Sequence, residues 1–191
     1  MAEPRIKYLT REEQGKFLGV VKSQGNQRDL TMYALMLRYG CRTEEVRGLK
    51  LEHLKLEDNS IYIARVKGSV SQYYPLRKDT RKMLEKWLAI RSKMSNADSE
   101  YLFITERSGA GMMSRQAPQK SFEKYAEIAG VTGHSPHSLR HSTAVNLLDE
   151  EVDLFDIQTW LGHSSINSTI KYLKISTGKK RVRMESILDR L

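Results

Sequence analysis

The sequence predicts a mainly α-helical fold with one small antiparallel β-sheet. Apolar residues recur three and four positions apart through most of the chain, and capping residues precede several of these segments. The only strong strand signal is a pair of short β-rich runs at 61–63 and 72–74, separated by the segment 67–71. No change in composition divides the 191 residues, so we expect a single domain over 1–191.

The helices expected in the first part of the chain have recognisable ends. Thr10 and Glu13 form a capping-box pattern that opens a helix through about Lys22. After a short loop, apolar residues recur at helical spacing as far as Gly40, a residue that commonly ends helices. A second, shorter helix is expected to begin around Arg42 and to end near residue 49.

The middle of the chain combines strands and one helix. The two β-rich runs predict a hairpin, or part of a three-stranded sheet, with Lys67 at or near its turn. Residues 79–94 carry their apolar side chains on one side of a helix. Residues 101–104 predict a brief buried strand or an extended segment.

The last third is expected to be helical. Ser114, Ser135 and Asp153 are capping residues, and Pro136 suits a first helical turn. The expected helices span 114–130, 136–149, 153–162 and a segment from 165 that carries Tyr172, followed by a basic helical tail at 179–191 within a C-terminal segment of about 176–191.

Composition limits the classes of protein to which the chain can belong. Lys and Arg total 32 against 23 Asp and Glu, a net charge of +9, which fits a polyanionic partner or a merely basic soluble protein. The single cysteine, Cys41, excludes an internal disulfide framework and a multi-cysteine zinc site, and favours a reducing, cytoplasmic compartment. No apolar run approaches the roughly 18 residues of a membrane span, and the first residues lack the apolar core of a signal peptide.

A set of polar residues in the last third suits phosphodiester chemistry. His137 and Arg140 lie three positions apart, so both face one side of a helix near its N-terminus, where free backbone N–H groups favour an anion. His163 follows Gly162, and Tyr172 comes nine positions after His163. Taken singly, these residues fit a solvated helix face, a helix-end histidine and a half-buried tyrosine. Together they could hold a phosphate and attack it with a phenol.

The segment SPHSLRHSTAVNLLDEEVDLFDIQTWLGHSSINSTIKY resembles the C-terminal signature of tyrosine recombinases, the phage-integrase and Xer-like family. The shared features are H-x-x-R, then L-G-H, then a tyrosine. Upstream, YGCRTEEVRGLKLEHL resembles the first arginine motif of the family, with Arg42 and Glu45 in the matching places. VKGSVSQYYPL resembles the hairpin that presents the catalytic lysine, which makes Lys67 the match. The resemblance extends from about Leu9 and implies the tyrosine-recombinase catalytic-domain fold.

The resemblance implies a DNA strand cleavage and rejoining reaction. Tyr172 is the expected nucleophile and forms a 3′-phosphotyrosyl link, with His137 as base. Arg42 and Arg140 are expected to bind the non-bridging phosphate oxygens in the transition state. No metal or other cofactor is implied.

The remaining expected roles also come from the resemblance. Lys67 protonates the departing 5′-oxygen, His163 donates a hydrogen bond to the phosphate, and Glu45 orients Arg42. Double-stranded DNA is the expected partner, and the protein is expected to assemble as a homotetramer on it. The C-terminal tail is expected to pack either onto a neighbouring protomer or back onto its own chain. The N-terminal core-binding domain of most family members is expected to be absent, as in a fragment or a compact single-domain recombinase.

Basic residues outside the motifs are candidates for the DNA surface. They are Arg115, Lys120, Lys124, Lys179, Lys180 and Arg181.

Other functions stay open from the sequence. A metal-dependent nuclease could use the histidines as ligands, because His137 and His141 have a metal-compatible spacing, although Arg140 between them would repel a cation. A type IB topoisomerase-like enzyme would share the cleavage chemistry but relax DNA instead of exchanging strands. A non-catalytic DNA-binding protein of the same fold is the third alternative.

Overall fold

The computed structural model describes residues 6–66, 68–105, 111–173 and 175. The described helices are α1 (Arg11–Ser23), α2 (Gln27–Tyr39), α3 (Thr43–Arg47), α4 (Lys78–Arg91), α5 (Ala117–Ile128), α6 (Pro136–Asp149), α7 (Leu154–Leu161) and α8 (Asn167–Ile170). A short 3-10 turn, η1 (Leu51–His53), leads into an antiparallel sheet of β1 (Leu54–Lys55), β2 (Ser60–Ile63) and β3 (Gln72–Pro75), in the order β1-β2-β3. The predicted fold class is thus confirmed. No described helix is long and apolar enough to cross a bilayer.

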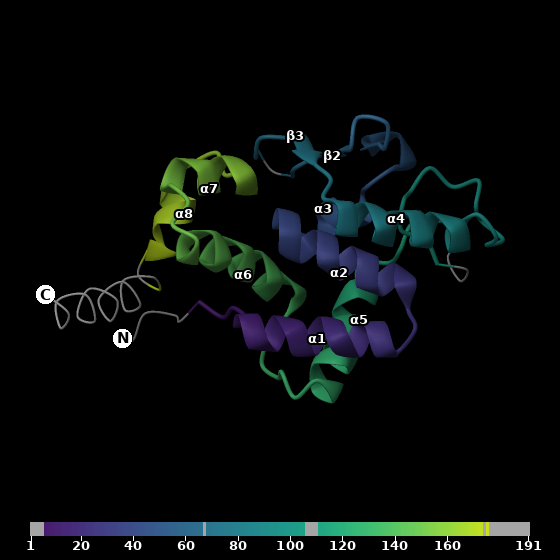
Figure 1. The fold of residues 1–191 in the computed structure, drawn as a ribbon, viewed down its shortest axis with the longest axis horizontal. Coiled ribbons are helices and arrows are strands. Elements are labelled where there is room, and N and C mark those ends of the chain that lie inside the picture. Colours follow the sequence, from purple (N-terminus) through teal and green to yellow (C-terminus); the bar gives the residue numbers. More distant parts are fainter. Residues whose placement is uncertain (1–5, 67, 106–110, 174, 176–191) are drawn as a thin grey trace, which may run out of the picture.

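Helix α2 is the centre of the molecule, and it contacts α1, α4 and α6 (Figure 1). Its inward side chains, Met32, Tyr33, Leu35 and Met36, have no exposed surface. Full burial of such a side chain contributes about 1.5–3 kcal/mol, so this helix anchors the main core. The sheet lies on one side of α2, and α7 and α8 lie at the end of α6, with α7 next to the hairpin (Figure 1).

A second core cluster joins α6, α7 and the chain that follows α8. It contains Ala144, Val145, Leu148, Ile157 and Leu161, together with Tyr172. This cluster brings the C-terminal motif onto the face of α6.

The predicted cap of α1 and the predicted glycine stops of α2 and α7 are present. The Thr10 hydroxyl accepts a hydrogen bond from the Glu13 N–H at 3.3 Å, and the Glu13 carboxylate accepts one from the Thr10 N–H at 2.7 Å. Helix α2 ends at Gly40 (φ 60°) and α7 ends at Gly162 (φ 67°), both in the left-handed conformation that favours glycine.

The β-hairpin is joined to the C-terminal end of α7 by hydrogen bonds. The Tyr74 hydroxyl donates to the Trp160 carbonyl at 2.6 Å, and Gln72 Nε2 donates to the Thr159 carbonyl at 2.7 Å. The Val70 N–H donates to the Gly162 carbonyl at 3.1 Å. These bonds fix the segment before His163 against the hairpin.

The structure refines the predicted boundaries at several places. Helix α5 begins at Ala117 because Ser114 caps a preceding turn, in which its hydroxyl accepts from the Ala117 N–H at 3.2 Å. Helix α8 ends at Ile170, so Tyr172 lies in the following turn, where its ring joins the cluster on α6. The segment 101–104 forms only isolated bridges with its neighbours. The expected tail at 179–191 lies outside the described residues.

Replacing Gly40 by alanine should destabilise the fold, because a Cβ there would lie 2.4 Å from Leu161 Cδ2 on a left-handed backbone. We expect a loss of more than about 1 kcal/mol in the free energy of unfolding, measured by urea denaturation. Gly19→Ala is the matched control. Gly19 is exposed within α1 with nothing within 4 Å of an added Cβ, so alanine should add about 0.5–1 kcal/mol there. Unchanged stability of Gly40→Ala would contradict this account.

Candidate active site

A buried carboxylate, Glu45, organises the site. Arg42 stands at the N-cap of α3, and Glu45 is the third residue of that helix. One oxygen, Oε2, accepts from the Arg42 N–H at 2.8 Å, and the other, Oε1, accepts from Arg42 Nη1 at 2.6 Å. The Glu45 side chain has no exposed surface, whereas 29% of the Arg42 side chain stays exposed. Arg42 is therefore held from behind and remains accessible at the surface.

Arg140 approaches the same carboxylate from α6. Its Nη1 donates to the Gly40 carbonyl at 2.5 Å and lies 4.0 Å from Glu45 Oε2, while its Nη2 donates to the Leu161 carbonyl at 2.9 Å. Only 1% of Arg140 is exposed. Burial, together with the nearby Arg42 and Arg65, lowers the pKa of Arg140 to about 10, so it is still a cation at neutral pH.

A third guanidinium, that of Arg65, completes the cluster and was not predicted. Its Nη1 donates to Glu45 Oε2 at 2.8 Å, and neither side chain is exposed. Burial alone would raise the pKa of Glu45, but Arg65 and the hydrogen bonds from Arg42 lower it overall. Glu45 is thus an anion surrounded by three cations. The sequence did contain a signal for Arg65. Ile61, Ile63 and Arg65 are spaced two residues apart, so along an extended strand their side chains point to the same, buried side of the sheet.

His163 is buried beside this cluster. Its Nδ1 lies 2.8 Å from the Thr169 hydroxyl of α8. When Nδ1 accepts that hydrogen, Nε2 carries the ring proton and can donate to a substrate. Burial and the nearby Arg140 and Arg42 lower the pKa of His163 to about 3, so the ring is neutral at physiological pH.

Tyr172 lies in the second core cluster with 1% of its surface exposed. Its hydroxyl forms a hydrogen bond of 2.7 Å with Nδ1 of His141. Burial raises the pKa of Tyr172 to about 12, although Arg140 and Arg42 act in the opposite direction. The phenol is therefore protonated and held inward in this structure.

His137 and His141 lie one turn apart on α6, and their rings meet edge to face with centroids 4.5 Å apart. His137 is exposed at the surface. Its pKa is nevertheless lowered, first because surrounding protein atoms partly desolvate the ring and second because the charge of Arg140 disfavours a second cation. Burial and His137 lower the pKa of His141 to about 3. The contact of His141 with Tyr172 was not predicted. The sequence marked His141 only as a possible metal ligand, although its spacing from His137 already placed both rings on one helix face.

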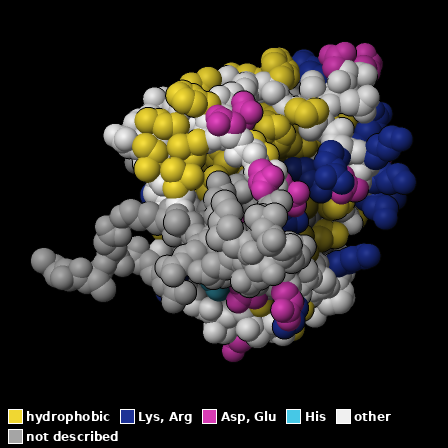
Figure 2. Space-filling view, turned by 60° about the vertical axis from the view of Figure 1, so that its left-hand side comes forward, with side chains coloured by type: hydrophobic (Ala, Val, Ile, Leu, Met, Phe, Trp, Pro, Cys, Tyr) yellow, Lys and Arg dark blue, Asp and Glu magenta, His cyan; other side chains and the backbone are white. Residues whose placement is uncertain are grey.

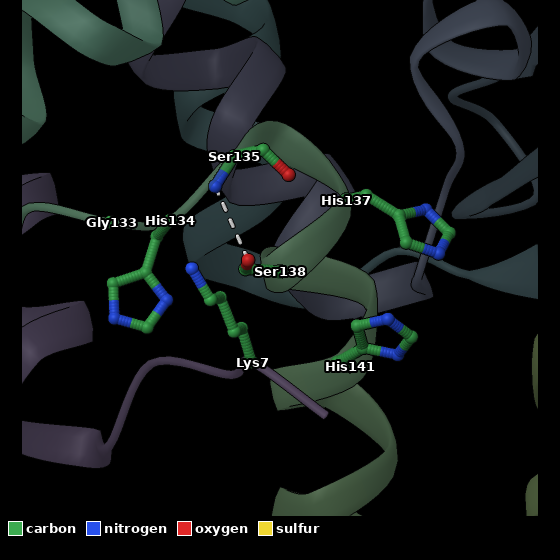
Figure 3. A pocket seen from close by; sticks show the side chains of 7 residues that line it. All are labelled: Lys7, Gly133, His134, Ser135, His137, Ser138 and His141. Atoms are coloured by element: carbon green, nitrogen blue, oxygen red, sulfur yellow. Dashed lines mark hydrogen bonds between the residues drawn. The ribbon is translucent and has the colours of Figure 1, made fainter. Parts of the chain in front are cut away.

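A cavity of about 280 Å³ opens at the first turn of α6 (Figure 3). Its lining consists of Lys7, Gly133, His134, Ser135, His137, Ser138 and His141. The Lys7 side chain extends from the segment before α1 toward this turn (Figure 3). The cavity therefore lies next to His137 and His141 and has one cationic side chain, Lys7, in its lining.

The other predicted residues are either exposed or not described. Arg115, Lys120 and Lys124 are exposed on α5 and on the turn before it. Lys67, Lys179, Lys180 and Arg181 lie outside the described residues. Lys and Arg side chains gather along one edge of the face in Figure 2, opposite an edge rich in hydrophobic side chains. Within the described ranges, no three His, Cys, Asp or Glu side chains group so as to hold a metal ion.

Comparison with known proteins identifies the family. Residues 7–179 match the phage integrase family. The chain is 32% identical over 167 residues to the type 1 fimbriae regulatory protein FimE of Escherichia coli, covering 87% of this chain and 84% of FimE. It is 37% identical over 155 residues to the tyrosine recombinase XerC of Thermodesulfovibrio yellowstonii, covering 78% of this chain and 50% of XerC. The chain thus spans about half the length of that XerC.

A solved structure of similar fold is the XerH site-specific recombinase bound to difH substrate in a pre-cleavage complex. It aligns with a TM-score of 0.74 at 25% identity, over 90% of this chain and 52% of XerH. With the family match over most of the sequence, this chain belongs to the phage integrase family, and its fold is that of a tyrosine recombinase catalytic domain.

Proposed function

We propose that this protein is a site-specific recombinase that cleaves and rejoins DNA strands through a 3′-phosphotyrosyl intermediate. The observation that carries the proposal is the approach of Arg42 and Arg140, distant in the sequence, to one carboxylate, with both guanidiniums near enough to Tyr172 to act on its pKa. FimE and XerC belong to the same family, and XerH was solved on a DNA substrate, which favours duplex DNA as the partner here.

In the proposed reaction, the scissile phosphate lies between Arg42 and Arg140. The Tyr172 oxygen attacks phosphorus, a P–O bond to tyrosine forms, and the bond to the 5′-oxygen breaks. The pentacoordinate transition state gains negative charge on the non-bridging oxygens, and the two guanidiniums stabilise that charge. His163 donates a further hydrogen bond through Nε2. Because the covalent link conserves the bond energy, attack by a 5′-hydroxyl reverses the step and rejoins the strands.

Proton transfer in this scheme uses the histidines of α6 and the hairpin lysine. The phenolic proton passes to a neutral imidazole, for which His137 and its neighbour His141 are suitably placed. Lys67 gives a proton to the departing 5′-oxygen. The inward position of Tyr172 requires that its turn shifts when DNA binds, so that the hydroxyl can reach the phosphate.

Assembly on DNA is part of the same proposal. Exposed apolar side chains on α7 and near α8, namely Phe155 (71%), Ile170 (40%) and Leu173 (36%), offer a contact for a second protomer in a tetramer. The proposed setting of the reaction is the cytoplasm.

Replacing Tyr172 by phenylalanine removes only the attacking oxygen. We expect no covalent DNA adduct on a nicked suicide substrate, with the dissociation constant for DNA changed by less than about threefold, because the ring still packs on α6. Denaturing gels measure the adduct and gel shifts measure binding. The control is Tyr73→Phe, whose exposed hydroxyl on β3 lies outside the site and whose adduct should form normally. Adduct formation by Tyr172→Phe would identify a different nucleophile.

Replacing Arg140 by alanine removes a donor to the transition state. The single-turnover cleavage rate should fall by about 10²–10³-fold or more. Because Arg140 also binds two backbone carbonyls, thermal unfolding of the variant must be measured alongside. An unchanged rate in the folded variant would remove Arg140 from the site.

DNA affinity should fall steeply with salt, because phosphate contacts release counterions. Replacing Lys120 and Lys124 by alanine should make the slope of log K against log[salt] shallower by about 0.9 for each phosphate that is no longer neutralised. Lys16→Ala is the control, because Lys16 is exposed on α1 and paired with Glu12 at 2.7 Å. A slope identical to that of the unmodified protein would exclude α5 from the DNA surface.

A further inference from the structure

Arg65 is a completely buried arginine that the proposed reaction does not use. It follows strand β2 and connects three segments through its Nη2 atom, which donates to the Tyr39 carbonyl at 2.8 Å, the Trp160 carbonyl at 3.0 Å and the Tyr74 hydroxyl at 2.7 Å. The end of α2, the hairpin and the end of α7 therefore meet at one guanidinium.

Arg65 also takes the position on Glu45 that Arg140 could otherwise occupy. Arg65 Nη1 lies 2.8 Å from Glu45 Oε2, whereas Arg140 Nη1 lies 4.0 Å from the same oxygen. The nearest acceptor of Arg140 Nη1 is instead the Gly40 carbonyl at 2.5 Å, to which Arg65 Nη1 also donates at 3.3 Å. The two arginines are thus held side by side with different principal acceptors.

Stability alone does not account for a charged residue at this point. Buried ion pairs can often be replaced by apolar side chains without loss of stability. Arg65 in addition leaves its Nε buried without a hydrogen-bond partner among the described residues, an arrangement that destabilises the folded state. A Cβ at Gly162 would lie 3.2 Å from this Nε and 2.7 Å from the Val70 carbonyl, so the chain before His163 packs closely against Arg65.

We propose that Arg65 is a positioning residue that neutralises Glu45, so that the charges of both Arg42 and Arg140 remain available to the substrate phosphate. This inference rests on the proposed function. A phosphodiester carries one negative charge and its pentacoordinate transition state carries two. With Arg65 present, Glu45 is balanced and two cations face that charge. Without Arg65, Glu45 draws on Arg42 and Arg140, and one of the two positive charges is lost to the transition state.

Single-turnover cleavage of a nicked duplex tests this assignment in two variants. Arg65→Met removes the charge and should slow cleavage about 10²-fold, because losing one electrostatic contact to the transition state has an effect of that size. Arg65→Lys keeps a cation near Glu45 and should slow it less, by about tenfold. If Arg65 acts by neutralising Glu45, either substitution should cost less than about threefold in a Glu45→Gln background, in which the carboxylate charge is already absent.

A second substrate reports on charge directly. A methylphosphonate at the scissile position replaces one non-bridging oxygen and removes one negative charge. The defect of Arg65→Met relative to the unmodified protein should shrink at least about tenfold on this substrate, because a neutral phosphonate needs one cation fewer. If Arg65→Met does not fold, Arg65→Lys is measured on both substrates and in both backgrounds. Its cleavage defect should also decrease on the methylphosphonate, by a smaller factor.

Arg91→Met is the matched control for a buried arginine. Arg91 is 3% exposed and donates to the Ala97, Ser99 and Tyr101 carbonyls, away from Glu45. We expect Arg91→Met to lower Tm, with any effect on cleavage equal on both substrates. Equal effects of the Arg65 substitutions with and without the Glu45 carboxylate, or equal defects on both substrates, would overturn the assignment. If the Arg42, Arg140 and Tyr172 variants all still cleave DNA, the proposed function itself is overturned.

Discussion

One buried carboxylate, surrounded by three guanidiniums, is the interaction on which the site depends. The Glu45 side chain is fully buried and accepts hydrogen bonds from Arg42 and Arg65, and Arg140 Nη1 lies 4.0 Å from its Oε2 atom. Three cations so close together repel one another, and burial strengthens that repulsion. Glu45 offsets one charge and two remain in excess. An anionic ligand would relieve this excess, so the fold is prepared for a phosphate before DNA arrives.

The backbone around the cluster is built to bring these side chains together. Gly40 ends α2 in a left-handed conformation, and its carbonyl receives both Arg65 and Arg140. Gly162 ends α7 in the same way, between the hairpin and His163. Neither position has room for a side chain. The two glycines explain how three separate segments approach closely enough to share donors and acceptors.

The proposed nucleophile, Tyr172, is buried in this structure. Tyr172 packs against the apolar side of α6, and its hydroxyl is paired with His141. Burial favours the neutral phenol more strongly than Arg140 and Arg42 favour the phenolate. A site with an accessible Arg42 and a buried proposed nucleophile is suited to an enzyme that cuts DNA only once the DNA is in place.

Most of the fold and much of the site could be predicted from local patterns. Caps such as Thr10 and stops such as Gly40 determine helix ends through bonds within a few residues, so the sequence reveals them. Arg65 and the contact of His141 with Tyr172 were missed because both depend on tertiary packing. The same packing ends α8 before Tyr172, a point that helical periodicity could not indicate.

The most direct measurement is a crystal structure of the protein on nicked DNA with vanadate as a mimic of the pentacoordinate transition state. The account predicts that Arg42 and Arg140 each contact a non-bridging vanadate oxygen at about 2.7–3.1 Å. It also predicts the Tyr172 oxygen in line with the departing 5′-oxygen, while Arg65 stays on Glu45. Vanadate bound by only one of the two arginines, or coordinated by a residue other than Tyr172, would contradict it.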